Sequence, residues 1–282
     1  MIWSGSIDRS DSSVLDDAEG RLDRTSHNAS VNQMRAYTAL IFDLFDTLID
    51  FRRDRMPLIQ VDGTEVRSTS RHVYDRFKTV CADVTFEAFY AAFMDGYREA
   101  ERIRARDWRE ISSEDRFRMV LSKLQVDPGD VPVDFPEWLA DIHMAKLSEA
   151  MVFPAEHRPL VEWARTRYRL AVISNFDHAP TARRLLEESG IIGHFEQVVI
   201  SAEEGVRKPH PEIFARTLAR MGLAPQEALF IGDSLAIDIA GAKGAGMDVA
   251  WVNRDGEALT DGNPAPDYNL ARLTELRDIL CR

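Results

Sequence analysis

YTALIFDLFDT, residues 37–47, begins with seven residues that combine apolar, aromatic and β-branched side chains and end in an acid. Such a run is typical of a buried parallel strand. The carboxylate of Asp43 then lies at the carboxyl end of a strand, where open parallel sheets bind their ligands. We therefore take residues 37–43 as the first strand of an α/β protein.

Runs of the same kind return only in the second half of the chain, where helical patterns separate them. The expected strands are residues 169–174, 197–201, 228–232 and 248–252. The expected helices are residues 158–166, 181–189, 211–221, 236–245 and about 273–280. Alternating strands and helices predict βαβ units wound into a Rossmann-like parallel sheet.

Residues 51–151 interrupt this alternation. Asp62-Gly63 separates two short apolar runs, which is a hairpin signal. Amphipathic patterns then predict helices at about 70–81, 85–106, 112–125 and 136–150. We expect a helical domain at 51–151, inserted into a core made of residues 36–50 and 152–282.

Residues 1–35 precede the first strand and are polar, rich in Ser and Asp, and without a helical or strand period. Such a segment buries too little apolar surface to order itself, so we expect a disordered tail. Met34 stands almost directly before the first strand, which leaves initiation at Met34 as an alternative.

Composition excludes several classes of function. Of the 282 residues 45% are hydrophobic, enough for a packed core. The 47 acidic and 35 basic side chains give a net charge of −12, which argues against a nucleic-acid or membrane partner. Two cysteines without a CxxC pair argue against a disulfide framework. We expect a cytoplasmic protein that acts on small molecules, as a monomer or a homodimer.

Four short segments at the ends of expected strands hold most of the chemically informative side chains. They are Asp43 to Thr47, Ser174-Asn175, Lys208-Pro209, and Gly232-Asp233 with Asp238. The ends of parallel strands converge on one crevice, where three carboxylates, a hydroxyl and an ammonium would meet. This set suits attack on an anionic substrate by a carboxylate nucleophile. A single Asp after a strand is more often a helix cap, but the ordered set favours chemistry.

In order and spacing these residues resemble the haloacid dehalogenase (HAD) superfamily of hydrolases, over residues 36–282. The resemblance implies hydrolysis of a small phosphorylated metabolite through an aspartyl-phosphate, beneath an inserted C1-type helical cap. It implies that Asp43, Ser174 and Lys208 are catalytic, and that the substrate binds Thr47, Ser174, Asn175 and Lys208. It also implies Mg²⁺ as cofactor, held by Asp43, the Phe45 backbone carbonyl, Asp233 and Asp238.

Phe45 departs from the phosphatase pattern of that family. Its phosphatases carry a second Asp, the general acid and base, two residues after the nucleophile, whereas here Asp46 comes one place later. An aromatic side chain at that position resembles the metal-independent 2-haloacid dehalogenases. Those enzymes bind the halide with an Arg, and the candidates for it in this chain are Arg52, Arg53 and Arg55.

Asp233 favours the phosphatase, because two neighbouring carboxylates ionise cheaply only around a cation. A metal-independent dehalogenase is the first alternative. The second is a non-catalytic binding or regulatory protein on the same fold.

The missing acid predicts which esters the chain can hydrolyse. A positioned proton donor is worth about 10²- to 10⁴-fold when the leaving group is a strong base. Aryl and acyl phosphates leave as weak bases, so we expect them to be hydrolysed better than alkyl phosphates. The expectation fails if Asp46 or His178 reaches the leaving oxygen.

Overall fold

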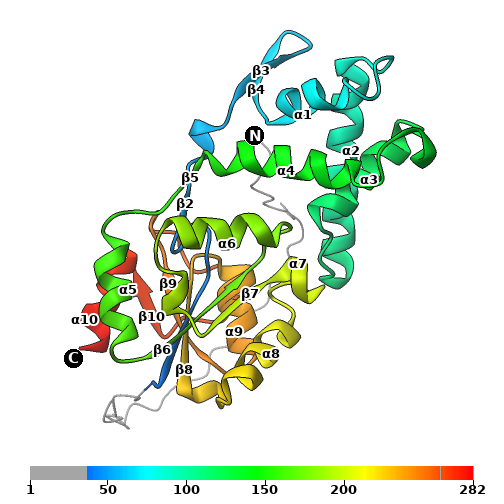
Figure 1. Ribbon diagram of the computed structural model, residues 1–282. Helices are drawn as coiled ribbons and strands as arrows, with labels where there is room; N and C mark the ends of the chain where they lie inside the picture. Colours follow the sequence, from blue (N-terminus) through cyan, green and yellow to red (C-terminus); the bar gives the residue numbers. More distant parts are fainter. Residues whose placement is uncertain (1–36, 261, 282) are drawn as a thin grey trace, which may run out of the picture. The chain divides into compact units, whose positions relative to one another are not determined.

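The computed structural model describes residues 37–260 and 262–281, so the expected tail at 1–35 lies outside the described residues. Six strands form one sheet in the order β10-β9-β8-β1-β6-β7, and every neighbouring pair is parallel (Figure 1). The strands are β1 (Ala39–Phe42), β6 (Arg169–Ser174), β7 (Gln197–Ile200), β8 (Ala228–Gly232), β9 (Asp248–Val252) and β10 (Tyr268–Leu270). The predicted α/β class and parallel sheet are confirmed.

β1 is fully buried because helices cover both faces of the sheet, and it therefore carries no polar side chain. Leu40 and Phe42 pack into one apolar cluster, and Ala39 and Ile41 into another. The first cluster includes residues of α5 (His157–Arg165), α6 (Ala179–Glu188) and α10 (Leu276–Leu280). The second includes residues of α8 (Pro211–Met221) and α9 (Ala240–Gly244).

The position of β1 in the sheet determines where a ligand can bind. β1 lies between β6 and β8, and the chain adds β7 outside β6 but β9 and β10 outside β8. The strand order thus reverses direction at β1, which opens a crevice at the carboxyl ends of these central strands. Asp43, Ser174 and Asp233 lie at those three ends.

Between β1 and β6 the chain forms the predicted helical insertion, in the manner of a C1 cap (Figure 1). Its base is the antiparallel pair β2 (Asp50–Phe51) and β5 (Met151–Val152). Within it follow the hairpin β3 (Leu58–Val61) and β4 (Thr64–Arg67), then α1 (Ser70–Phe77), α2 (Phe86–Asp107), α3 (Ser113–Lys123) and α4 (Phe135–Ser148). A separate apolar cluster fills it, centred on Phe77, Phe89, Phe117 and Phe135. The limits 51–151 stay a prediction.

The insertion contacts the core through buried charged groups. Arg104 of α2 donates from Nε to Glu110 at 2.9 Å and from Nη2 to Asp177 at 3.3 Å. Glu110 also accepts from the hydroxyl of Ser201, at the start of α7 (Ser201–Glu204), at 2.5 Å. Arg104, Glu110 and Asp177 are each more than nine-tenths buried. We call Arg104, Glu110, Asp177 and Ser201 the cap–core ion cluster.

Some elements differ from the prediction. The expected helix at 236–245 is a π-helical turn, η5 (Leu235–Ile239), followed by the short α9. β10 was not predicted, because three residues carry too little pattern without their partner β9. Within residues 37–260 and 262–281, no helix combines the length and apolar character of a membrane-spanning helix.

Candidate active site

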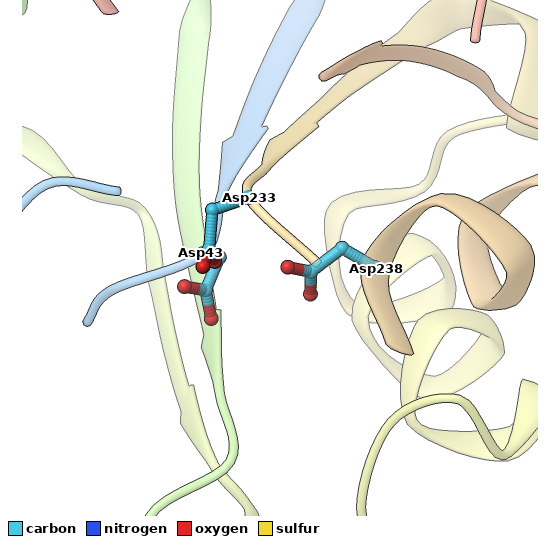
Figure 2. Close-up of side chains that lie close together, drawn as sticks. All are labelled: Asp43, Asp233 and Asp238. Atoms are coloured by element: carbon cyan, nitrogen blue, oxygen red, sulfur yellow. The ribbon is translucent and has the colours of Figure 1, made fainter. Parts of the chain in front are cut away.

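Three carboxylates converge at the carboxyl edge of the sheet (Figure 2). Asp43 follows β1, Asp233 follows β8, and Asp238 lies in the turn η5. One oxygen of each lies within 4.8 Å of the others. The backbone N–H of Asp43 donates to the carbonyl of Ile231 at 2.8 Å, which ties the end of β1 to β8. The structure therefore brings together the three predicted acidic side chains.

The environment of these carboxylates opposes their ionisation. Burial, with a smaller contribution from Asp238, raises the pKa of Asp43 to about 7, against the opposing effect of Lys208. Burial, followed by the charges of Asp238 and Asp43, raises the pKa of Asp233 to about 8. Without a further cation the group holds protons near neutral pH.

Lys208 brings one positive charge into this cluster and is almost completely buried. Its ammonium donates to Asp43, to the carbonyl of Ile173 at 2.8 Å, and lies 2.8 Å from Asp238. Burial lowers the pKa of Lys208, but the carboxylates of Asp238 and Asp43 outweigh it and the pKa is raised. Lys208 therefore stays charged at neutral pH.

The side chain of Asn175 fixes the backbone of Lys208. Its amide nitrogen donates to the Lys208 carbonyl at 2.9 Å, and its amide oxygen accepts from the Lys208 N–H at 2.8 Å. Two bonds from one planar group restrain the segment that carries the ammonium. Asn175, expected as a substrate ligand, uses both atoms of its amide for this restraint.

Ser174 and Thr47, two further predicted residues, are fully buried beside the carboxylates. The hydroxyl of Thr47 donates to Asp233 at 3.4 Å. Among the described residues no partner is found for the hydroxyl of Ser174, although buried hydroxyls normally have one. An anionic oxygen in the crevice would supply that partner.

The fit of this site to a metal ion follows from its charges. When all three carboxylates are ionised, they and the one ammonium leave two net negative charges in a buried place. Carboxylate oxygens are the ligands that hard divalent cations prefer, and a divalent ion neutralises this excess. The donor set therefore fits Mg²⁺.

Gly232 is a site residue that the prediction did not single out for its geometry. A Cβ there would lie 2.6 Å from the carboxyl group of Asp238, so only glycine lets the π-helical turn fold back over the end of β8. In that turn the Ser234 N–H donates to Asp238 at 3.1 Å. A Gly-Asp pair after a strand, with an acid five residues later, is the sequence signal of this arrangement.

Comparison with known sequences finds related hydrolases. Residues 37–246 match the profile of the haloacid dehalogenase-like hydrolases. The glyceraldehyde 3-phosphate phosphatase of Pyrococcus abyssi is 29% identical over 75% of this chain and 79% of its own length. The phosphoserine phosphatase of Thermus thermophilus is 33% identical, over 49% of this chain and 55% of its own.

Solved structures show the same fold. A 2-haloacid dehalogenase from Pseudomonas syringae superimposes with a TM-score of 0.62 and 22% identity, covering 87% of this chain and 99% of that one. A magnesium-bound HAD-hydrolase from Bacillus subtilis gives a TM-score of 0.56 at 21% identity, covering 87% and 99%. At such identities the likeness concerns the fold alone.

Replacing Gly232 by Ala should displace Asp238, because the new Cβ would overlap its carboxyl group. We expect the Mg²⁺ affinity, measured by calorimetry, to fall about tenfold or more, because the displaced Asp238 would no longer orient Lys208 and the surroundings of the ion. Gly244→Ala is the matched control, since nothing lies within 4 Å of a Cβ there. Equal affinities in the two variants would contradict the close approach.

The raised carboxyl pKa values predict a pH-dependent coupling of Mg²⁺ to stability. The pKa values of Asp43 and Asp233 in the fold lie above those of an unfolded chain, so their contribution to stability is lost as pH rises from about 4 through 8. In chelator, the Tm should therefore fall over this range. Mg²⁺ should raise the Tm more at pH 8 than at pH 6, since protons compete for its ligands. A Mg²⁺ effect that is equal at both pH values would count against this site.

Proposed function

Because this chain belongs to the haloacid dehalogenase-like hydrolases, we propose that it is a Mg²⁺-dependent phosphatase acting on small phosphorylated metabolites. The observation that carries the proposal is the cluster of Asp43, Asp233 and Asp238, whose net negative charge calls for a divalent cation. The phosphatase names of its relatives from Pyrococcus abyssi and Thermus thermophilus support it.

Asp43 is the nucleophile of the proposed reaction. Its carboxylate, positioned by the end of β1 and by Lys208, attacks phosphorus and forms an aspartyl-phosphate, which water then hydrolyses. Lys208 and the unpartnered hydroxyl of Ser174 neutralise and bind the phosphoryl oxygens. Asn175 keeps the ammonium of Lys208 in place and Thr47 orients Asp233.

Asp43, the Phe45 carbonyl and Asp233 would hold the ion, with Asp238 orienting its surroundings and Lys208. When bound, Mg²⁺ would shield the negative charges of nucleophile and phosphate from one another. The substrate is therefore a small anion, and we propose a cytoplasmic enzyme with neither a nucleic-acid nor a membrane partner.

A metal-independent 2-haloacid dehalogenase is the second candidate, and Phe45 is the observation that favours it. The same nucleophile would then attack carbon. Of the three arginines named as halide ligands, Arg53 binds Asp46 at 2.7 Å and Arg52 binds Asp54 at 3.3 Å. The extra carboxylate of Asp233 has no use in a reaction without a cation.

Asp43→Asn should reduce phosphate release from 4-nitrophenyl phosphate to below about 1% of the wild-type rate. An amide oxygen is too weak a nucleophile to form the covalent intermediate. Acid-quenched protein should carry covalently bound phosphate in the wild type and none in the variant. Activity above a few per cent in correctly folded Asp43→Asn protein would remove Asp43 as the nucleophile.

Asp233→Asn should weaken Mg²⁺ binding and phosphate release together, by about tenfold or more each, since it removes a hard anionic ligand. The matched assay is halide release from a 2-haloacid, in Mg²⁺ and in chelator. Halide release in chelator that is insensitive to Asp233→Asn would establish the dehalogenase and overturn the phosphatase. If neither phosphate nor halide is released, the result would favour a binding protein.

A further inference from the structure

Two phenylalanines lie beside the proposed catalytic groups. Phe45 is two residues from Asp43 and Phe176 two residues from Ser174, and their ring centroids are 4.5 Å apart with planes inclined by 42°. Both rings are half-buried and pack on the cluster under α6. We call them the aromatic pair.

The backbone on each side of the aromatic pair is fixed. The Phe176 N–H donates to the hydroxyl of Ser201 at 2.9 Å. On the other side, the Leu48 N–H donates to the carbonyl of Leu44 at 2.9 Å, closing the turn that carries Phe45. The two half-buried rings are thus carried by backbone that is held in place, two residues from Asp43 and from Ser174.

Two side chains are candidates for donating a proton to a leaving group beside the aromatic pair, Asp46 and His178, and both contact other groups. The Asp46 carboxylate accepts from the Phe51 N–H at 3.0 Å and from Arg53 at 2.7 Å, so both contacts hold it away from the aromatic pair. His178 contacts Thr181 at 3.0 Å through Nδ1 and Asp141 at 3.3 Å through Nε2.

The remaining titratable neighbours of Asp43 are already assigned as well. Lys208, Asp233 and Asp238 carry the charges of the proposed metal and phosphate site. The two side chains considered as proton donors, Asp46 and His178, are thus held by other partners.

We propose that the substrates of this enzyme are phosphate esters with a weakly basic leaving group, foremost esters of phenols, whose ring binds against Phe45 and Phe176. The inference rests on the proposed phosphatase function and narrows its substrate class. The ring of the substrate would gain an aromatic contact with this pair in addition to the burial of its apolar surface.

The chemistry of the first step explains this selection. An oxygen of Asp43 bonds to phosphorus, and the bond from phosphorus to the ester oxygen breaks with its electron pair leaving on that oxygen. A phenol has a pKa of about 10, whereas an alkanol is about as weak an acid as water, at about 16. A phenolate can leave without a proton, and an alkoxide cannot.

The second step does not depend on the leaving group. Water attacks phosphorus, the electron pair of the bond to Asp43 returns to the carboxylate, and the proton of the water passes to solvent. This step has no side-chain base and is slow for every substrate. With a good leaving group, the aspartyl-phosphate should therefore form faster than it is hydrolysed.

The experiment compares 4-nitrophenyl, phenyl, acetyl and propyl phosphate with Mg²⁺ present. We expect kcat/KM to fall about 100-fold or more from phenyl to propyl phosphate, because a general acid usually contributes a factor of this size. The first step should be about as fast with acetyl phosphate as with the aryl esters. With 4-nitrophenyl phosphate a burst of nitrophenolate, about equal to the enzyme concentration, should precede a slow steady state.

Phe45→Asp and Phe45→Asn form a matched pair, since only the first can carry a proton. Phe45→Asp should raise kcat/KM for propyl phosphate about tenfold or more and diminish the burst, whereas Phe45→Asn should do neither. Asp46→Asn should leave the ratio of aryl to alkyl activity unchanged. A selective loss of propyl phosphate hydrolysis in Asp46→Asn would identify Asp46 as a donor and overturn the inference.

Binding supplies a readout that needs no turnover. Phenylphosphonate should bind about tenfold more tightly than propylphosphonate, and Phe176→Leu should remove most of that difference. Equal binding, or equal kcat/KM for phenyl and propyl phosphate in an active enzyme, would overturn the inference and leave the phosphatase standing. No phosphate release from any of the three esters or from acetyl phosphate would instead overturn the phosphatase itself.

Discussion

The mutual repulsion of three carboxylates at the end of β1 is the constraint around which the rest of this structure is arranged. Asp43, Asp233 and Asp238 meet within 4.8 Å, and in the described part of the chain Lys208 alone brings an opposite charge among them. Each neighbouring feature serves to hold them there. The reversal of strand order positions two of them, the π-helical turn over Gly232 positions the third, and Asn175 restrains the lysine. Because negative charge accumulates in the site as Asp43 and Asp233 ionise, a cation would add to the stability of the site as well as to its chemistry.

The strands β6, β8 and β9 have the bounds predicted from sequence, because each is a continuous apolar run covered on both faces. The convergence of Asp43, Ser174 and Asp233 followed from the rule that parallel strands end at one edge. The π-helical turn did not follow, since its pattern is that of an α-helix and its cause is the contact of Asp238 with Gly232. The pairing of Asn175 with the backbone of Lys208 joins residues 33 positions apart and leaves no local signal.

Phe45 shows why sequence and fold comparisons point in two directions for one chain. The sequence relatives have names of phosphatases, whereas the structural neighbours include 2-haloacid dehalogenases. The fold alone therefore does not decide whether the proposed nucleophile Asp43 attacks phosphorus or carbon. Two side chains favour different answers. Asp233 adds a carboxylate that suits the proposed Mg²⁺ site, whereas Phe45 places an apolar ring two residues after Asp43.

The cap–core ion cluster has a consequence for how the two parts of the molecule can separate. Arg104, Glu110 and Asp177 are buried where the insertion meets the core. Groups of this kind are costly to remove from water, and a buried ion pair returns little of that cost as net stability. The same groups are hydrated well as soon as they part, unlike an apolar interface, which water penetrates only at a large expense in free energy. Separation here is therefore an exchange of ion pairs for hydration shells, so the polarity of the solvent should affect its equilibrium.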